Sequence, residues 1–346
     1  MERLLRNRFD AYLKSVAQLN KMDPAAGLVI RQLPMVHNLA RELTAAVGFW
    51  LDADPEKALQ ALNRGIDPLT TEIYELTSNR AGTGQSGPLF RVREEKLGAR
   101  FSEQDMFHIP FEKRDRVATR RYSFPGLPCL YLGRSVYICW EESGRPDLHA
   151  LWVSKFIVAP GETVRVLDFG HRPASVAAGL HYTQSGKPNG FSLANAAAYA
   201  SLWPLIAGCS VRRQRERQSS FVVEYVLPQL LLWWLMSRMR LHATNHLDGI
   251  RYFSTQVDDD SIGIAGMNYV FPSQDRQQNG HCPILLKKFH LSPPVNWQIV
   301  MVHPRPPQAN YNKVHFAMTP GHIEQYGSTD FGRVESFVEI LPTGPA

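Results

Sequence analysis

Apolar residues recur at steps of three and four along the first part of the chain. The clearest run consists of Leu4, Leu5, Phe9, Tyr12, Leu13 and Val16, which is the spacing of one face of an α-helix. Further helices are expected from about Met35 to Leu51, from Asp54-Pro55 through Leu62, and from Thr70 to Leu76 after Asp67-Pro68. In both Asp-Pro pairs an N-cap residue precedes a proline at the first helical position. The pattern predicts a small helical unit over residues 1–85, for which packing or partner binding is the simplest role.

The pattern changes after Pro88. Short apolar or alternating runs, rich in Val, Ile, Phe and Tyr and separated by Pro and Gly, predict strands. They are Leu89–Val92, Leu130–Leu132, Leu151–Val158, Thr163–Leu167, Gly249–Phe253 and Val295–Val302. Helical patterns lie at Ser135–Glu142, Leu193–Ile206 and Val222–Met239, and strand-like pieces continue from Asn310 to Leu341. This mixture predicts an α+β fold.

A domain boundary is expected at Ser78 to Pro88, which is rich in Gly, Ser and Asn. Its GTGQSG segment lacks the lysine of a phosphate-binding P-loop, so we interpret the stretch as a linker. The predicted organisation is a helical unit over residues 1–85 and a second domain over residues 86–260. A C-terminal extension over residues 261–346 is expected to pack on the second domain or to continue it.

Composition narrows the class of protein. The chain has 346 residues, of which 44% are hydrophobic and 20% charged, with a net charge of +6; this is the balance of a soluble globular protein. The four cysteines show no CxxC spacing, so we expect no zinc site and no disulfide framework, and a cytoplasmic location is the simplest. The charged N-terminus lacks the apolar core of a signal peptide. The most apolar run, Tyr225–Met236, is too short to cross a bilayer and contains Pro228, so no membrane partner is expected.

Candidate chemistry gathers in the stretch from Arg121 to Glu142, which reads RYSFPGLPCLYLGRSVYICWEE. Arg121 precedes a Pro-Gly turn, Tyr131 lies on the predicted strand that follows, and Glu141 and Glu142 end the next predicted helix. Guanidinium groups bind phosphate oxygens, and an aromatic ring stacks on a base or on nicotinamide. A carboxylate can bind ribose hydroxyls and stabilise an oxocarbenium-like transition state. If these elements converge, the set suits a nucleotide ligand, although each residue alone also has an ordinary structural role.

The same stretch resembles the RES domain family, which is named for its characteristic arginine, glutamate and serine. The family pattern is an arginine before an aromatic residue and a Pro-Gly turn, a Leu-Tyr-Leu strand, and a small helix that ends in glutamate. Arg121, Tyr131 and Glu142 stand in those places, with Glu141 as an alternative for the glutamate. The pair Phe90-Arg91 resembles the opening strand of the family. The serine corresponds to Ser220, or to Ser219 beside it, ahead of FVVEYVLPQLL.

The resemblance, which covers roughly residues 88–260, implies a fold similar to ADP-ribosyltransferase toxins, with two small sheets packed around an NAD-binding cleft. It implies a toxin of a toxin–antitoxin pair that degrades NAD by phosphorolysis or hydrolysis, or that ADP-ribosylates a protein. Arg91 and Arg121 would hold the phosphates of NAD or an attacking inorganic phosphate, and Tyr131 would contact the nicotinamide-ribose end. Glu142 would bind the ribose and stabilise the transition state, and Ser220 would add a polar contact. The helical unit and the C-terminal extension exceed the compact toxins and could hold a target or replace an antitoxin.

Two other classes of function remain open at the level of the sequence. The basic run Arg212–Arg217 and the net charge would fit a nucleic-acid-binding protein, but Glu216 interrupts the run and no aromatic residues alternate with it, so this partner is not expected. A non-catalytic module that binds a protein partner is the third reading. The histidines match no metal motif, and His108 is the one that lies near the central stretch. The sequence does not distinguish phosphorolysis, hydrolysis and transfer, because they differ only in what attacks the same carbon.

Overall fold

The computed structural model describes residues 1–18, 24–78, 82, 87–96, 98, 100–172, 176, 192–213, 221–241, 246–257, 260–275, 277–302, 315–319 and 322–346. The chain forms two compact units, and both are built from discontinuous segments. Unit 1 comprises Met1–Thr77, Thr119–Phe124 and Leu167–His246; unit 2 comprises Ser78–Ala118, Pro125–Val166 and Leu247–Ala346. The predicted mixture of helices and strands is confirmed, but the units do not follow the three consecutive segments that the sequence suggested.

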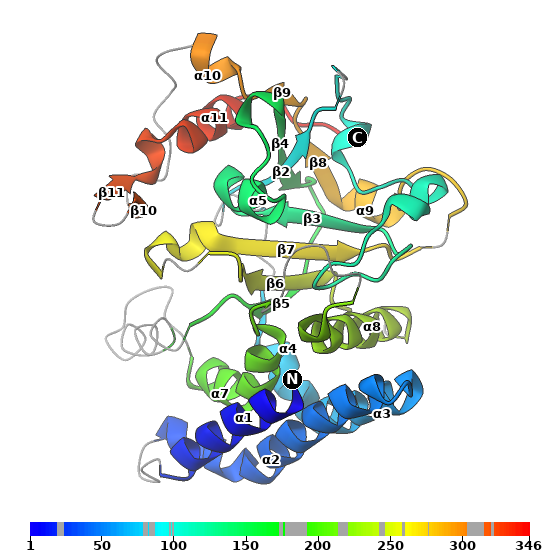
Figure 1. Ribbon diagram of the computed structural model, residues 1–346, viewed down its shortest axis with the longest axis vertical. Coiled ribbons are helices and arrows are strands. Elements are labelled where there is room, and N and C mark those ends of the chain that lie inside the picture. Colours follow the sequence, from blue (N-terminus) through cyan, green and yellow to red (C-terminus); the bar gives the residue numbers. More distant parts are fainter. Residues whose placement is uncertain are drawn as a thin grey trace. The chain divides into compact units, whose positions relative to one another are not determined.

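Unit 1 is helical. Its helices are α1 (Glu2–Ala17), α2 (Pro24–Leu51), α3 (Pro55–Ile66), α4 (Thr70–Glu75), α7 (Leu193–Cys209) and α8 (Val226–Leu241), with 3₁₀ turns η1 (Asp67–Leu69) and η5 (Val223–Tyr225). The predicted cap of α3 is confirmed, since the side chain of Asp54 accepts a hydrogen bond of 3.0 Å from the backbone N–H of Lys57. The long α2 packs against α1, α3 and α7 (Figure 1). The helical unit therefore includes α7 and α8, which the sequence placed in the second domain.

Unit 2 contains most of the strands. They are β2 (Leu89–Glu94), β3 (Cys129–Gly133), β4 (Leu151–Val158), β6 (Gly249–Phe253), β7 (Met267–Pro272), β8 (Phe289–Leu291), β9 (Val295–Asn296), β10 (His315–Thr319) and β11 (His322–Gln325). Its helices are α5 (Val136–Glu142), α9 (Pro283–Lys288), α10 (Ile299–Val302) and α11 (Asp330–Glu339), with 3₁₀ turns η2 (Gln104–Met106), η3 (Phe111–Arg116), η4 (Leu148–Ala150), η6 (Asp260–Gly266) and η7 (Tyr326–Ser328). The short strands β1 (Thr77–Ser78) and β5 (Val166–Phe169) lie where the chain passes between the units.

The main sheet of unit 2 has the strand order β6-β7-β3-β2-β4-β8, with β9 also paired to β4. The pairings of β2 with β3 and β4, of β7 with β3 and β6, and of β4 with β8 and β9 are antiparallel. Strands β10 and β11 form a separate two-stranded sheet. A single larger sheet and a small ribbon thus stand where the resemblance implied two small packed sheets.

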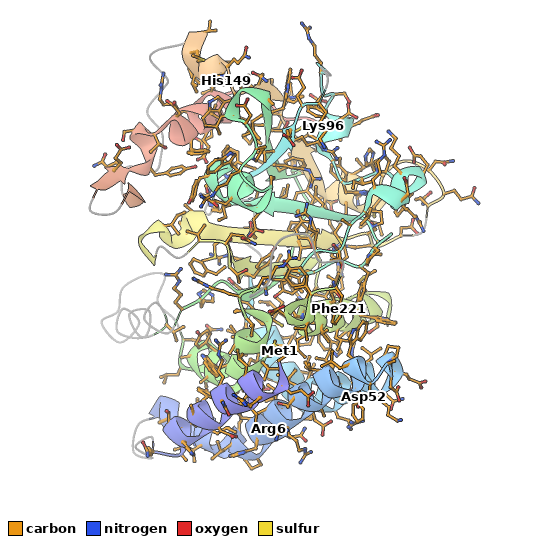
Figure 2. All side chains as sticks on the ribbon, in the orientation of Figure 1. Met1, Arg6, Asp52, Lys96, His149 and Phe221 are labelled. Carbon is orange, nitrogen blue, oxygen red and sulfur yellow. The ribbon has the colours of Figure 1, made fainter. Side chains whose placement is uncertain are left out.

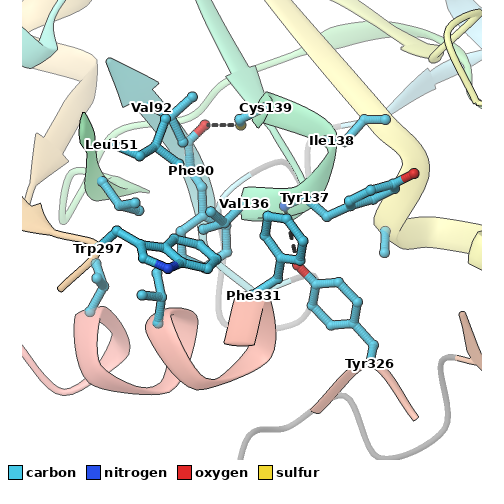
Figure 3. Close-up of a cluster of buried hydrophobic side chains, with 14 of the residues drawn as sticks. Phe90, Val92, Val136, Tyr137, Ile138, Cys139, Leu151, Trp297, Tyr326 and Phe331 are labelled. Atoms are coloured by element: carbon cyan, nitrogen blue, oxygen red, sulfur yellow. Dashed lines mark hydrogen bonds between the residues drawn. The ribbon is translucent and has the colours of Figure 1, made fainter. Parts of the chain in front are cut away.

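Alternate residues of each strand point to opposite faces of the sheet, and both faces are covered. On one face Phe90, Val92 and Val153 pack with residues of α5 and α11; we call it the α5 face. On the opposite face Leu89, Leu130, Phe156 and Phe271 pack with Phe107 and Phe111. Figure 3 shows the cluster on the α5 face, where Trp297 and Phe331 lie edge to face with ring centroids 5.0 Å apart.

Two strand predictions near the C-terminus are wrong. The run Val295–Val302 is not one strand, because Asn296 ends β9: its side-chain oxygen accepts a hydrogen bond of 2.9 Å from the N–H of Gln298, which is a typical turn contact of asparagine. Residues 299–302 then form α10. The expected strands after residue 310 include β10 and β11, but residues 330–339 form α11. Its buried Phe331, Val334 and Val338 have helical spacing, and Thr329 caps it.

The C-terminal segment is an integral part of unit 2. Nζ of the buried Lys155, on β4, donates hydrogen bonds of 2.7 Å to the carbonyl oxygens of Glu339 and Leu341 at the end of α11. These carbonyls lie at the negative end of the helix and lack partners within it. Leu291 also pairs with Gly344 through two backbone hydrogen bonds. The lysine and the backbone pairing hold the last described residues against the sheet.

Candidate active site

The site candidates of unit 2 depend on the turn that joins β3 to α5. A side chain at Gly133 would place its Cβ 2.5 Å from Sγ of Cys139 and 2.6 Å from Ile138. Glycine therefore lets α5 fold back closely against the end of β3 (Figure 1). Ser135 caps the helix and accepts a hydrogen bond of 3.1 Å from the N–H of Ile138. The turn and the cap fix the start of a short helix whose last residue is Glu142.

Glu142 is anchored by two polar side chains from distant parts of the chain. Ser254, which follows β6, and Asn268, on β7, each donate a hydrogen bond of 2.7 Å to the same carboxylate oxygen, Oε1. Both donors are nearly buried, at 7% and 4% exposure, whereas Glu142 is half-buried. Among the described residues, the other oxygen, Oε2, has no hydrogen bond. One oxygen thus fixes the carboxylate in place and the other is available for a ligand.

The structure separates the two adjacent glutamates. The side chain of Glu141 is only 3% exposed and its Oε2 forms an ion pair of 2.8 Å with Nε of Arg145, four residues later. Arg145 also lies over the ring of Trp140, 5.7 Å from its centroid. Glu141 therefore serves to close the C-terminal end of α5. Of the two carboxylates, Glu142 is the one held by side chains of the sheet.

Tyr131 and Arg91 lie on neighbouring strands, but the register assigns their side chains to opposite faces. Tyr131 pairs with Val270, two residues from Asn268, so its side chain is on the α5 face together with Asn268. Arg91 pairs with Ser154 and alternates with Phe90, so it points to the opposite face. Its Nη1 nevertheless donates a hydrogen bond of 3.0 Å to the backbone oxygen of Tyr131. The sheet thus places Tyr131 and Glu142 on one face and Arg91 on the opposite face.

Arg121 lies in unit 1, where its guanidinium is already engaged. It is 7% exposed, and its Nη1 donates hydrogen bonds of 2.8 and 3.0 Å to the carbonyl oxygens of Cys209 and Val211, just after α7. The guanidinium carbon also lies 5.1 Å from the centroid of the Tyr225 ring. These contacts give Arg121 a structural role within unit 1. Glu142 belongs to unit 2.

The segment that carries Arg121 is fastened to α8. Nε2 of Gln229 donates hydrogen bonds of 3.0 and 3.1 Å to the carbonyl oxygens of Arg120 and Ser123. Phe124 packs edge to face against Trp233, with ring centroids 5.9 Å apart. Helix α8 therefore fixes the position of the segment that carries Arg121.

Several candidates lie outside the described residues. They include Ser219 and Ser220, most of the GTGQSG segment, and residues 214–217 of the basic run. The next described residue is Phe221, whose side chain is 53% exposed (Figure 2). The proposed serine therefore stays a prediction.

Sequence reasoning missed the partners of Glu142. Asn268 had a signal, since it is a lone amide within the apolar run MNYVF and is almost fully buried in β7. A buried amide requires hydrogen-bond partners. Ser254 comes directly after Gly249–Phe253, which the sequence predicts only as a strand. Neither residue could be linked to Glu142 without the pairing of β3, β7 and β6.

The remaining reactive side chains of the described residues are buried in structural positions. Burial raises the pKa of the Cys209 thiol to about 12, and it also raises the pKa of Cys129 and Cys139. Thiols in this state are poor nucleophiles. His108 is fully buried on the opposite face, where its Nε2 accepts a hydrogen bond of 2.8 Å from the N–H of Cys282. These residues act in packing, and His108 lies away from Glu142.

Within the described part of the chain, no group of three or more histidine, cysteine, aspartate or glutamate residues is arranged to bind a metal ion. In the same residues, no helix has the length and apolar character needed to cross a bilayer.

Comparison with known proteins gives one clear relative. The chain is 30% identical over 343 residues to a Bacillus subtilis (strain 168) protein described as "Putative toxin YopC". The match covers 95% of this chain and 74% of the relative. No family model matches the chain, and no solved structure matches it significantly.

Proposed function

We propose that this chain is a toxin that consumes NAD, because it belongs to the same protein family as YopC, which is described as a putative toxin. The reaction is cleavage of the bond between nicotinamide and ribose. Water or inorganic phosphate accepts the ADP-ribosyl group. The relative supports the assignment to toxins. The resemblance to the RES domain family and the arrangement around Glu142 support NAD as the substrate.

The observation that carries the proposal is the anchoring of Glu142. Ser254 and Asn268 both bind Oε1, so the carboxylate is held in place before any ligand arrives. Departure of nicotinamide leaves positive charge on the anomeric carbon and ring oxygen of the ribose. A preorganised anion stabilises this charge more than a mobile one, because little reorganisation is required in the transition state. Oε2 would accept a hydrogen bond from a ribose hydroxyl and face the developing charge.

The other candidate residues take supporting roles in this proposal. Tyr131 lies on the same sheet face as Asn268, where its ring would stack against nicotinamide or ribose. Arg91 would provide positive charge from the opposite side of the same sheet, whereas the phosphate contact of Arg121 and the polar contact of Ser220 stay predictions of the resemblance. An antitoxin or a protein target is the expected macromolecular partner, and transfer of ADP-ribose to a protein is the alternative outcome.

The test is incubation of the purified protein with NAD, with and without phosphate, followed by chromatography of the products. ADP-ribose indicates hydrolysis, ADP-ribose 1-phosphate indicates phosphorolysis, and label on protein indicates transfer. Glu142→Gln should abolish release of nicotinamide while the protein remains folded. Glu141→Gln is the matched control, because it removes a neighbouring carboxylate that binds Arg145 instead. Intact NAD with the wild-type protein, or normal turnover by Glu142→Gln, would refute the proposal.

A further inference from the structure

Side chains satisfy all three first-turn amides of α5. The N–H of Val136 donates to Oε1 of Glu335 at 2.5 Å, the N–H of Tyr137 to the hydroxyl of Tyr326 at 3.3 Å, and the N–H of Ile138 to Ser135. The first amides of a helix have no partner within it. Two of these three acceptors come from far downstream in the sequence, Tyr326 in η7 and Glu335 within α11, at separations of 189 and 199 residues.

The two downstream acceptors are connected to each other. The hydroxyl of Tyr326 donates a hydrogen bond of 2.6 Å to the same oxygen of Glu335 that binds Val136. Both side chains are fully buried, at 0% exposure. Figure 3 shows Tyr326 reaching toward the backbone of Tyr137, beneath the ring of Phe331. A carboxyl group, a phenol and the start of α5 thus form one closed network inside the apolar cluster.

The opposite end of the same helix carries Glu142. Helix α5 has only 7 residues, which corresponds to a length of about 10 Å. A rigid helix this short transmits a shift at its first turn directly to its last residue. A displacement of about 1 Å at a reacting group is enough to reduce a rate by about 100-fold.

We propose that Glu335, together with Tyr326, is a positioning residue for Glu142, which it holds in place by binding the first turn of α5. This inference rests on the proposed function for its catalytic consequence. Its structural part, the dependence of α5 on Glu335, stands independently of the reaction.

The charge state of Glu335 makes this role sensitive to pH. Burial raises the pKa of the Glu335 carboxyl from 4.5 to about 8, although the hydrogen bonds from Tyr326 and Val136 and the charge of Arg134 act in the opposite direction. Glu339, on the same helix, adds to the rise, and the thiol of Cys139 faces the group from α5. A raised pKa means that the folded state, in which Glu335 binds the first turn of α5, favours the neutral carboxyl. The binding of α5 by Glu335 is therefore strongest below pH 4.5 and weakens as the pH rises from 4.5 to about 8.

Two variants separate the acceptor from the charge. Glu335→Gln keeps an oxygen acceptor for Val136 and Tyr326 but cannot ionise, whereas Glu335→Leu removes the acceptor and introduces an apolar side chain of similar size. Glu339→Gln is the matched control: it lies one turn later on α11, and among the described residues its side chain makes no hydrogen bond to α5.

The experiment measures amide hydrogen exchange of residues 136–142 and the kcat and KM for release of nicotinamide from NAD, from pH 5 to pH 9. Glu335→Leu should accelerate exchange of the α5 amides at least about tenfold and lower kcat by about 10- to 100-fold, with KM nearly unchanged. Glu335→Gln should restore both properties and flatten their dependence on pH. Glu339→Gln should leave the exchange of α5 unchanged at pH 5, well below the pKa of Glu335.

Normal exchange of α5 in Glu335→Leu would overturn the proposal. So would failure of Glu335→Gln to restore the exchange rate. If the wild-type protein leaves NAD intact, the proposed function fails, and the exchange of α5 alone then decides whether Glu335 holds the helix.

Discussion

Ser254 donates a hydrogen bond of 2.7 Å to Oε1 of Glu142, across 112 residues of sequence. Asn268 donates to the same oxygen at the same distance. Glu142 is half-buried and both donors, which are nearly buried, bind one of its two oxygens; the part of the chain that the structure describes gives the second oxygen no hydrogen bond. The two hydrogen bonds make Glu142 the residue on which the proposed function depends.

Replacement of Asn268 by aspartate should disable the site by charge alone. The variant conserves shape but places a second carboxylate against Glu142, and two like charges at hydrogen-bonding distance cannot both ionise readily. Release of nicotinamide at pH 7 should fall by about 10- to 100-fold, with partial recovery as the pH rises. Asn268→Ala, which removes the donor without adding charge, should lower the rate but keep the native pH dependence. An unaltered pH profile in Asn268→Asp would argue against a role for ionised Glu142.

Replacement of Arg121 by lysine should cost stability. An ammonium group cannot reproduce the two carbonyl contacts and the contact with the Tyr225 ring, because these depend on the extended planar guanidinium. The free energy of unfolding should fall by about 2 kcal/mol, measured as the urea midpoint. A variant of native stability that nevertheless fails to turn over NAD would show instead that Arg121 acts on the ligand.

Replacement of Gly133 by alanine should push α5 away from β3. The added Cβ would overlap Cys139 and Ile138, and overpacking of this kind costs about 1–3 kcal/mol. Nicotinamide release should fall even where the variant remains folded, because Glu142 lies on the displaced helix. Gly344→Ala, where a Cβ meets no atom within 4 Å, should change neither property. Thermal unfolding and the rate of nicotinamide release check the pair of variants.

Stability should fall in acid because of His108. Burial lowers the pKa of this histidine from 6.5 to about 4, and burial also lowers the pKa of His281 beside it. A lowered pKa means that the folded protein favours the neutral ring. The contribution is therefore complete above pH 6.5 and is lost as the pH falls toward 4, with a total of about 3 kcal/mol. The measurement is the urea midpoint at pH 7 and pH 4.5. His108→Gln should reduce the difference between the two values, whereas His149→Gln, at an exposed position, should leave it unchanged.

The local elements around the site could be predicted from the sequence because their signals are local. The strand at Leu130–Leu132 and the helix that ends at Glu142 are present, with Ser135 as the cap. Val295–Val302 was misread because its β-branched residues favour strands, while a single Asn296 side chain ends the strand early. The strand-like pieces expected up to Leu341 include residues 330–339, which form a helix. The spacing of Phe331, Val334 and Val338 is helical.

The arrangement of the site could not be predicted, because it depends on pairings between distant segments. The register of β3 with β7 brings Asn268 to the face that carries Glu142, and the pairings of β2 with β3 and β4 separate the side chains of Tyr131 and Arg91. No local pattern around Arg121 indicates that its guanidinium caps the end of α7. Strand register and helix contacts at long range are set by the whole core, and a single sequence shows the candidates without their partners.

The interleaving of the two units has a consequence for the synthesis of the protein. The chain passes from one unit to the other at residues 77–78, 118–119, 124–125, 166–167 and 246–247. A ribosome therefore cannot release a finished first unit before it begins the second, in contrast to domains that follow one another and fold in turn. The helix that carries Glu142 also leaves the ribosome long before Tyr326 and Glu335 exist to bind its first turn. On the proposed function, a nascent chain would carry Glu142 without a working site, and the cell that makes the toxin would be exposed to its activity only after Tyr326 and Glu335 have been synthesised.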